Sequence, residues 1–125
     1  ARAIRYAVFV EEQGVPVELE WDEFDVPSVH AVARDAAGAA LATGRLLPDG
    51  HIGRMAVLAR ARGQGVGAQV LLALVERAKA RGDASVVLNA QTHAAPFYAR
   101  YGFMPEGEEF MEAGIPHIAM RRLLA

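Results

Sequence analysis

The most informative stretch of the chain is RARGQGVGA, residues 60–68. It follows an alternating segment, residues 51–58, and precedes apolar residues that recur at helical spacing. The first backbone N–H groups of a helix are unpaired and carry a partial positive charge, and glycines let such a backbone wrap closely around an anion. The glycines of the stretch are Gly63, Gly65 and Gly67. Their position predicts a loop that binds an anion, and a pyrophosphate suits it best.

Two arginines of this stretch, Arg60 and Arg62, would add charge-assisted contacts to a phosphate. The stretch lacks the Gly-Lys-Ser/Thr ending of a Walker A loop, and its G-x-G-x-G spacing differs from the G-x-G-x-x-G of a dinucleotide site. The simpler alternative is a tight turn between a strand and a helix. Because three glycines and two arginines exceed what a turn needs, we favour anion binding.

The remaining pattern predicts helices and strands around one sheet. Helices are expected at residues 2–12, 66–82 and 93–100, and residues 15–27 are expected to be irregular. Strands are expected at residues 29–34, 39–47, 51–58, 84–90, 103–111 and 116–124. The first three strands would form an antiparallel meander. No repeat or linker interrupts the pattern, so we expect a single domain over residues 1–125, of the α+β or mixed α/β class.

Composition narrows the function. The 125 residues are 53% apolar and 22% charged with a net charge of −2, which favours a folded domain and argues against binding of nucleic acid. The chain has no cysteine, so disulfides and thiolate nucleophiles are excluded, and a reducing cytoplasm is expected. No apolar run approaches the roughly 20 residues of a membrane span. No metal site is expected, because the histidines lack ligand spacing. They are His30, His51, His93 and His117.

The charges are unevenly distributed. Seven acidic residues lie between Glu11 and Asp25, whereas no Lys or Arg occurs from position 6 to position 33. Basic residues follow in the middle of the chain, from Arg54 onward. The pattern indicates two sites of opposite sign, with two solvated faces as the alternative.

Two motifs resemble those of the GNAT N-acetyltransferases. Arg62-x-x-Gly65-x-Gly67-Ala68 matches the R/Q-x-x-G-x-G/A loop of that family. Residues 91–103, QTHAAPFYARYGF, resemble its second signature, N-x-x-A-x-x-(L/F)-Y-x-x-x-G-F, with Gln91 at the usual Asn. Flanking residues are similar to the ElaA-like branch. They are residues 8–16, Glu20, Asp22, Asp25, His30, Gly44, Arg45 and residues 117–120.

This resemblance implies a fold and a set of cofactor-binding residues. The fold is a central, mostly antiparallel mixed sheet flanked by helices, and the family's first strand is expected to precede Ala1 and to be absent here. Backbone amides of the loop would hold the CoA pyrophosphate, the strand before it would bind the pantetheine arm, and Gln91 would contact a cofactor amide. These cofactor-binding residues are Met55, Ala56, Val57, Arg62, Gly63, Gln64, Gly65, Val66, Gly67, Ala68 and Gln91.

The implied reaction also assigns catalytic roles. The family places a tyrosine, here Tyr98, beside the CoA sulfur, and a phenol with an ordinary pKa of about 10 can protonate the leaving thiolate. A backbone N–H on the strand at residues 55–57 would stabilise the oxyanion. The base is left among several candidates, with Glu12 and His30 preferred. Residues expected on the acceptor side are Gln13, Glu20 and His117, of which Glu20 and His117 are also candidate bases.

The expected function is transfer of the acetyl group of acetyl-CoA, without an acyl-enzyme, to a primary amine of a small cationic acceptor. Alternatives are a non-catalytic acyl-CoA sensor and a domain that binds another phosphate ligand. Amino acids, polyamines, aminoglycosides and protein N-termini all stay open as acceptors. Many family members are dimers, so a homodimer is compatible with the resemblance.

Overall fold

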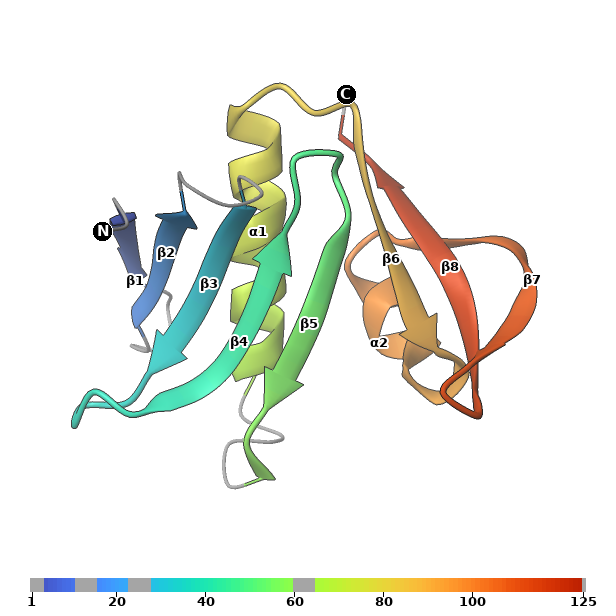
Figure 1. Ribbon diagram of the computed structural model, residues 1–125, viewed down its shortest axis with the longest axis horizontal. Helices are drawn as coiled ribbons and strands as arrows, with labels where there is room; N and C mark the ends of the chain where they lie inside the picture. The colour runs from blue at the N-terminus through green and yellow to red at the C-terminus, as the bar shows by residue number, and fades with distance from the viewer. Residues whose placement is uncertain (1–3, 11–15, 23–27, 60–64, 125) are drawn as a thin grey trace.

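The computed structural model describes residues 4–10, 16–22, 28–59 and 65–124 (Figure 1). Five consecutive strands precede the first helix, one strand separates it from the second, and two strands follow, an order that fits the mixed α+β class. The elements before the first helix are β1 (Ile4–Val10), β2 (Pro16–Asp22), β3 (Ser28–Arg34), β4 (Ala40–Leu46) and β5 (Ile52–Val57). The others are α1 (Val66–Ala80), β6 (Ser85–Gln91), a 3₁₀ turn (Thr92–Ala94), α2 (Ala95–Arg100), β7 (Met104–Glu112) and β8 (Ile115–Leu123).

The strands form two sheets, where the sequence predicted one. The first has the order β1-β2-β3-β4-β5 and the second the order β6-β8-β7, and all pairs within them are antiparallel. One parallel bridge, between His51 and Val87, joins the sheets at the end where β5 begins. Away from that bridge β5 and β6 diverge (Figure 1). The α+β class and the mostly antiparallel pairing are confirmed, and the sheet is divided at β5 and β6.

The helix predicted at residues 2–12 is wrong. Ile4–Val10 is strand β1, paired with β2 from Ile4 opposite Asp22 to Val10 opposite Pro16. Most of the segment IRYAVFV is β-branched or aromatic, a composition that favours a strand, and periodicity alone cannot tell a short apolar run in a helix from one in a strand. The irregular segment predicted at residues 15–27 is likewise wrong over Pro16–Asp22, which is β2.

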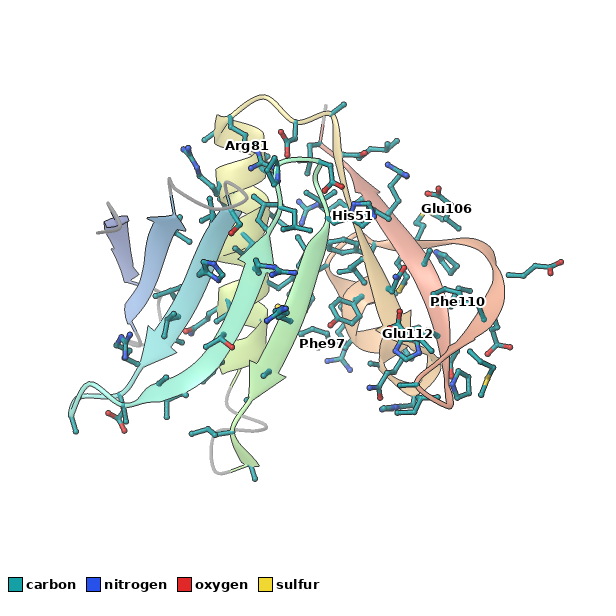
Figure 2. The ribbon with its side chains drawn as sticks, viewed as in Figure 1. His51, Arg81, Phe97, Glu106, Phe110 and Glu112 are labelled. Carbon is teal, nitrogen blue, oxygen red and sulfur yellow. The ribbon has the colours of Figure 1, made fainter. Side chains whose placement is uncertain are left out.

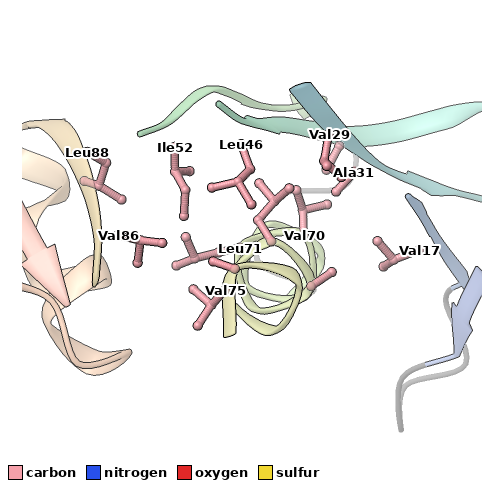
Figure 3. Packing of buried hydrophobic residues seen from close by; sticks show 14 of the residues in the cluster. Val17, Val29, Ala31, Leu46, Ile52, Val70, Leu71, Val75, Val86 and Leu88 are labelled. Carbon is pink, nitrogen blue, oxygen red and sulfur yellow. The ribbon is translucent and has the colours of Figure 1, made fainter. Parts of the chain in front are cut away.

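The core lies between α1 and the two sheets. Leu71, Leu74 and Val75 of α1 are fully buried, and residues from β3, β4 and β6 surround them (Figure 3). Arg77 and Lys79 in the last turn of α1 complement the negative end of the helix dipole. Because α1 packs against strands of both sheets, it holds the two sheets together. The first turn of the helix lies beside β5.

Gly50 forms the joint between the sheets, and we expect Gly50→Ala to destabilise the fold. Gly50 has φ +90°, and its carbonyl accepts a hydrogen bond of 3.0 Å from the N–H of Val87. A Cβ at this position would lie 3.0 Å from the backbone oxygen of Ser85. Backbone strain and this contact together should lower the free energy of unfolding by about 2 kcal/mol, measured by urea denaturation.

The matched control for Gly50→Ala is Gly38→Ala. Gly38 lies in the β3–β4 turn with φ +87°, and a Cβ there meets nothing within 4 Å. It therefore carries the strain without the contact, and its loss of stability should be smaller, about 1 kcal/mol. If the two variants lost the same free energy of unfolding, the contact between the added Cβ and the backbone oxygen of Ser85 would cost nothing.

Candidate active site

A bulge in β5 shapes the site. Thr43 pairs with Ala56 and Arg45 pairs with Gly53, so Gly44 of β4 stands opposite two residues of β5, Arg54 and Met55. Arg54 has φ +53°, in the left-handed region that a residue with a side chain rarely occupies. A bulge bends its strand and leaves the extra residue outside the ladder. The bend therefore falls where β5 diverges from β6.

A first cavity, of about 430 Å³, lies between β5, α1 and α2. Its walls come from three elements that are separated in the sequence and meet beside the gap between the sheets. Figure 2 shows Phe97 of α2 in this region. The lining residues are Met55, Ala56, Val57, Gly65, Val66, Gly67, Ala68, Phe97, Tyr98, Arg100 and Tyr101. Its volume is that of a typical small-molecule site.

The start of α1 forms the wall of this cavity that suits an anion. Gly65 is the N-cap, with φ +76°, and no side chain caps the helix. The first turn has no acidic residue, so nothing there offsets the partial positive charge of its N–H groups. A Cβ on Gly67 would lie 3.1 Å from Cγ2 of Val57, so glycine lets the helix pack closely on β5. This end of the cavity can bind a phosphate group through the backbone.

A second cavity, of about 500 Å³, lies between β5 and β6. It shares Met55 and Tyr98 with the first cavity, so the two spaces meet at these side chains. Its lining residues are Ile52, Gly53, Arg54, Met55, Leu88, Asn89, Gln91, His93, Ala94, Tyr98 and His117. Polar groups converge in it, as in a substrate site.

Tyr98 is the polar side chain common to both cavities. It is half-buried, and its ring contacts Phe97 and Phe103, with centroids 5.1 and 6.1 Å away. Burial raises the pKa of the Tyr98 hydroxyl above its ordinary value of 10.0, because the phenolate would be poorly solvated. The hydroxyl therefore holds its proton at neutral pH and can donate it.

His117 forms part of the wall of the second cavity opposite β5. It lies on β8 and is buried, with 7% of its surface exposed. Its Nδ1 lies 2.8 Å from the carbonyl oxygen of Ile115, and its Nε2 lies 3.5 Å from a carboxylate oxygen of Glu112. A neutral imidazole has one ring nitrogen that can accept a proton.

The structure brings most of the residues predicted to bind the cofactor around the first cavity. All three predicted residues of β5 and all four from Gly65 to Ala68 line it. Gln91 lines the second cavity instead. Arg62, Gly63 and Gln64 lie outside the described residues.

The predicted acceptor-side residues are less closely grouped. His117 lines the second cavity, whereas His30 lies on β3, where its Nε2 is 3.3 Å from Oγ of Ser28, and it lines neither cavity as the described residues define them. Glu20 is placed by its backbone, opposite His30 in the β2–β3 register. Glu12 and Gln13 lie outside the described residues.

Sequence reasoning missed several residues of the second cavity. Arg54 and Asn89 line it, and Glu112 stands beside His117. Asn89 carried a usable signal, since it is the polar residue that interrupts the apolar run of β6. No sequence signal identified Arg54, because its position in the cavity depends on a bulge that the local sequence does not predict.

Two further properties concern only the described part of the chain. None of its helices has the length and apolar character needed to cross a membrane. Nor do any three of its His, Asp or Glu side chains cluster in a way that could hold a metal ion.

Comparison with known proteins identifies the family. The sequence profile of the acetyltransferase (GNAT) domain matches residues 7–124. The uncharacterized N-acetyltransferase YjcF of Bacillus subtilis is 40% identical over 122 residues, which cover 95% of this chain and 87% of that protein.

Similar solved structures lead to the same family. An acyl-CoA N-acyltransferase from Pseudomonas aeruginosa is 39% identical with a TM-score of 0.69, and the match covers 77% of this chain and 68% of that one. Escherichia coli ElaA is 33% identical with a TM-score of 0.69, covering 76% of this chain and 68% of its own. The resemblance seen in the two sequence motifs is confirmed, and the chain belongs to the GNAT acetyltransferase family.

Proposed function

We propose that this protein transfers the acetyl group of acetyl-CoA directly to a primary amine of a small cationic acceptor. The observation that carries the proposal is that two cavities, one suited to a phosphate ligand and one lined by polar side chains, meet at Met55 and Tyr98. A group-transfer enzyme needs its two substrates to meet at one point. The absence of cysteine from the sequence supports direct transfer.

The first cavity is proposed to hold acetyl-CoA. Backbone N–H groups at Gly65–Ala68 suit the pyrophosphate, and the backbone of Met55–Val57 suits the pantetheine arm, which can pair with it as a strand does. Arg62, Gly63 and Gln64 directly precede Gly65 in the sequence and are proposed to contribute to the same pyrophosphate site. Bound acetyl-CoA would supply a thioester carbonyl open to attack by an amine.

The second cavity is proposed to hold the acceptor, and Tyr98 is proposed as the acid. The hydroxyl of Tyr98 would donate its proton to the departing sulfur. A backbone N–H of β5 near the bulge would stabilise the oxyanion, since the bulge frees backbone groups from the ladder. The acidic first quarter of the sequence, with seven acids between Glu11 and Asp25, supports a cationic acceptor.

Thermal-shift titration tests the cofactor. Acetyl-CoA and CoA, at about 100 times their Kd, should each raise the free energy of unfolding by about 2.7 kcal/mol, whereas ATP and NAD should not. Gly65→Trp should abolish the shift, because its side chain would enter the first cavity at the start of α1. Thiol release from acetyl-CoA with a panel of primary amines then tests turnover.

The control for Gly65→Trp is Gly38→Trp. The two glycines have φ +76° and +87°, so both variants carry similar backbone strain, but Gly38 lies in a turn away from both cavities. It should keep the full response to acetyl-CoA. If ATP or NAD stabilised the wild type more than acetyl-CoA, the first cavity would belong to another phosphate ligand. If CoA bound without turnover of any amine, a sensor role would replace catalysis.

A further inference from the structure

The hairpin of β7 and β8 presents a paired histidine and glutamate that the proposed function does not yet use. His117 and Phe110 are register partners, and their rings stack with centroids 5.9 Å apart at 25°. Glu112 is opposite Ile115 at the end of the same hairpin. Figure 2 shows Phe110 and Glu112 on this hairpin, away from α1. The ring of His117 is therefore held by a stacking contact and by a hydrogen-bonding group at Nδ1, with the Glu112 carboxylate near Nε2.

The contacts define which nitrogen carries the proton in the neutral ring. The carbonyl oxygen of Ile115, 2.8 Å from Nδ1, can only accept a hydrogen bond, so Nδ1 must donate. In a neutral imidazole Nε2 then keeps its lone pair. The carboxylate of Glu112 lies 3.5 Å from Nε2, which is an ion-pair distance, and no hydrogen bond between them is found among the described residues. Nε2 is thus a proton acceptor with a negative charge beside it.

Burial separates the roles of the two side chains. The His117 side chain is 9% exposed and lines the second cavity, whereas the Glu112 side chain is 56% exposed and does not line it. The buried ring is therefore paired with an exposed carboxylate, which offers a proton on Nε2 a route to water. The other charged or titratable residues of the described cavity wall are Arg54, His93 and Tyr98. No ion pair with a carboxylate is found for Arg54 or His93 in the described structure, and an arginine does not act as a proton acceptor.

We propose that Nε2 of His117 accepts the proton lost by the acceptor amine, and that Glu112 is the positioning residue that stabilises this proton and passes it to solvent. The amine nitrogen forms a bond to the carbonyl carbon as its N–H proton moves to Nε2. The carbon–sulfur bond breaks, and the thiolate takes the Tyr98 proton. His117 then releases its proton through Glu112, and the phenolate of Tyr98 regains one from water. This inference rests on the proposed function.

Kinetics of Glu112→Gln test the pair. With spermidine, L-lysine and kanamycin as acceptors, kcat should fall about 10–100-fold, as for other residues that orient a functional histidine, while KM for acetyl-CoA stays unchanged. Added formate should restore part of kcat in this variant, because a free carboxylate can replace the lost one. Glu112→Asp should keep more activity than Glu112→Gln.

The control is Glu109→Gln, which removes the same charge from the same exposed strand. No hydrogen bond or ion pair of Glu109 is found within the described part of the chain, so its kcat should match the wild type. Equal activity of the two glutamine variants would overturn the proposal. So would a loss in Glu112→Gln that neither formate nor Glu112→Asp reduces, since that pattern is expected of a structural role.

The protonation state of the ring gives a test that needs no acceptor. In ¹⁵N NMR spectra of labelled protein at pH 9, with His117→Asn to identify the signals, the neutral ring should carry its proton on Nδ1. A ring protonated at Nε2 would have no lone pair there and would overturn the proposal. If the wild type acetylated none of the amines, the proposed function would fail. The NMR spectra would still show whether Nε2 of His117 is the unprotonated nitrogen beside Glu112.

Discussion

Replacing Tyr98 with phenylalanine is expected to lower kcat by about 10²–10⁴-fold, the usual contribution of a general acid or base. The substitution removes the hydroxyl and keeps the ring, so the contacts with Phe97 and Phe103 persist and the fold should be unchanged. Because the hydroxyl acts only as the thiolate leaves, KM for acetyl-CoA should change little. Steady-state kinetics with thiol detection measure both constants.

Tyr101→Phe is the matched control for this variant. Tyr101, the C-cap of α2, is also half-buried and lines the first cavity, but it does not line the second. Loss of its hydroxyl should leave kcat within about twofold, as expected of a group that makes no contact with the reacting atoms. If Tyr98→Phe behaved like Tyr101→Phe, another group or water would have to protonate the sulfur.

The pH profile offers a second measurement on the same residue. The acid works only while protonated, and burial raises the pKa of Tyr98 above 10.0. Any decrease in wild-type kcat that comes from this group should therefore be centred above pH 10. In Tyr98→Phe that alkaline decrease should disappear from the residual activity. A wild-type decrease centred below pH 10 would belong to another group.

The elements around the first cavity could be predicted because local sequence determines them. Periodic apolar residues predicted α1, and the structure places the glycines predicted to precede the helix at its N-terminus, where Gly65 and Gly67 line the first cavity. The expectations for β3, β4, β5 and α2 depended in the same way on alternation, turn residues and a proline in the first helical turn, and that for β6 on a continuous apolar run.

The N-terminal segment could not be predicted in this way. Ile4, Val8 and Phe9 fit a helical spacing, yet Ile4–Val10 pairs with Pro16–Asp22 along its whole length. Seven residues are too few for periodicity to distinguish the two states, and the pairing partner decides between them. Tertiary context therefore overrides the local pattern here.

The acceptor side required the fold as well. The sequence alone does not distinguish His30 from His117, since each is a lone histidine in a predicted strand. Their strands belong to different sheets, and of these two histidines only His117 lines the second cavity as the described residues define it. The partner of His117, Glu112, is set by the register of the β7–β8 hairpin, which a sequence does not specify.

Gly44→Val is expected to destabilise the protein by about 3 kcal/mol, at the upper end of the usual cost of overpacking a core. Gly44 lies on β4 opposite the bulge, and its face is packed against α1. A Cβ there would lie 2.5 Å from Sδ of Met55 and 3.0 Å from methyl carbons of Leu74 and Val70. The last two side chains are fully buried and cannot move aside without disturbing the core. Urea denaturation measures the loss.

The same variant should also weaken the response to acetyl-CoA, because Met55 lines both cavities and would be displaced. Gly53→Val is the matched control for stability: it adds the same side chain to the neighbouring strand, where a Cβ meets nothing within 4 Å. Its stability should stay within about 0.5 kcal/mol of the wild type. If the two variants were equally stable, the core around Gly44 would be able to accommodate a valine side chain without cost. Lost stability with an unchanged response to acetyl-CoA would mean that Met55 is not part of the cofactor site.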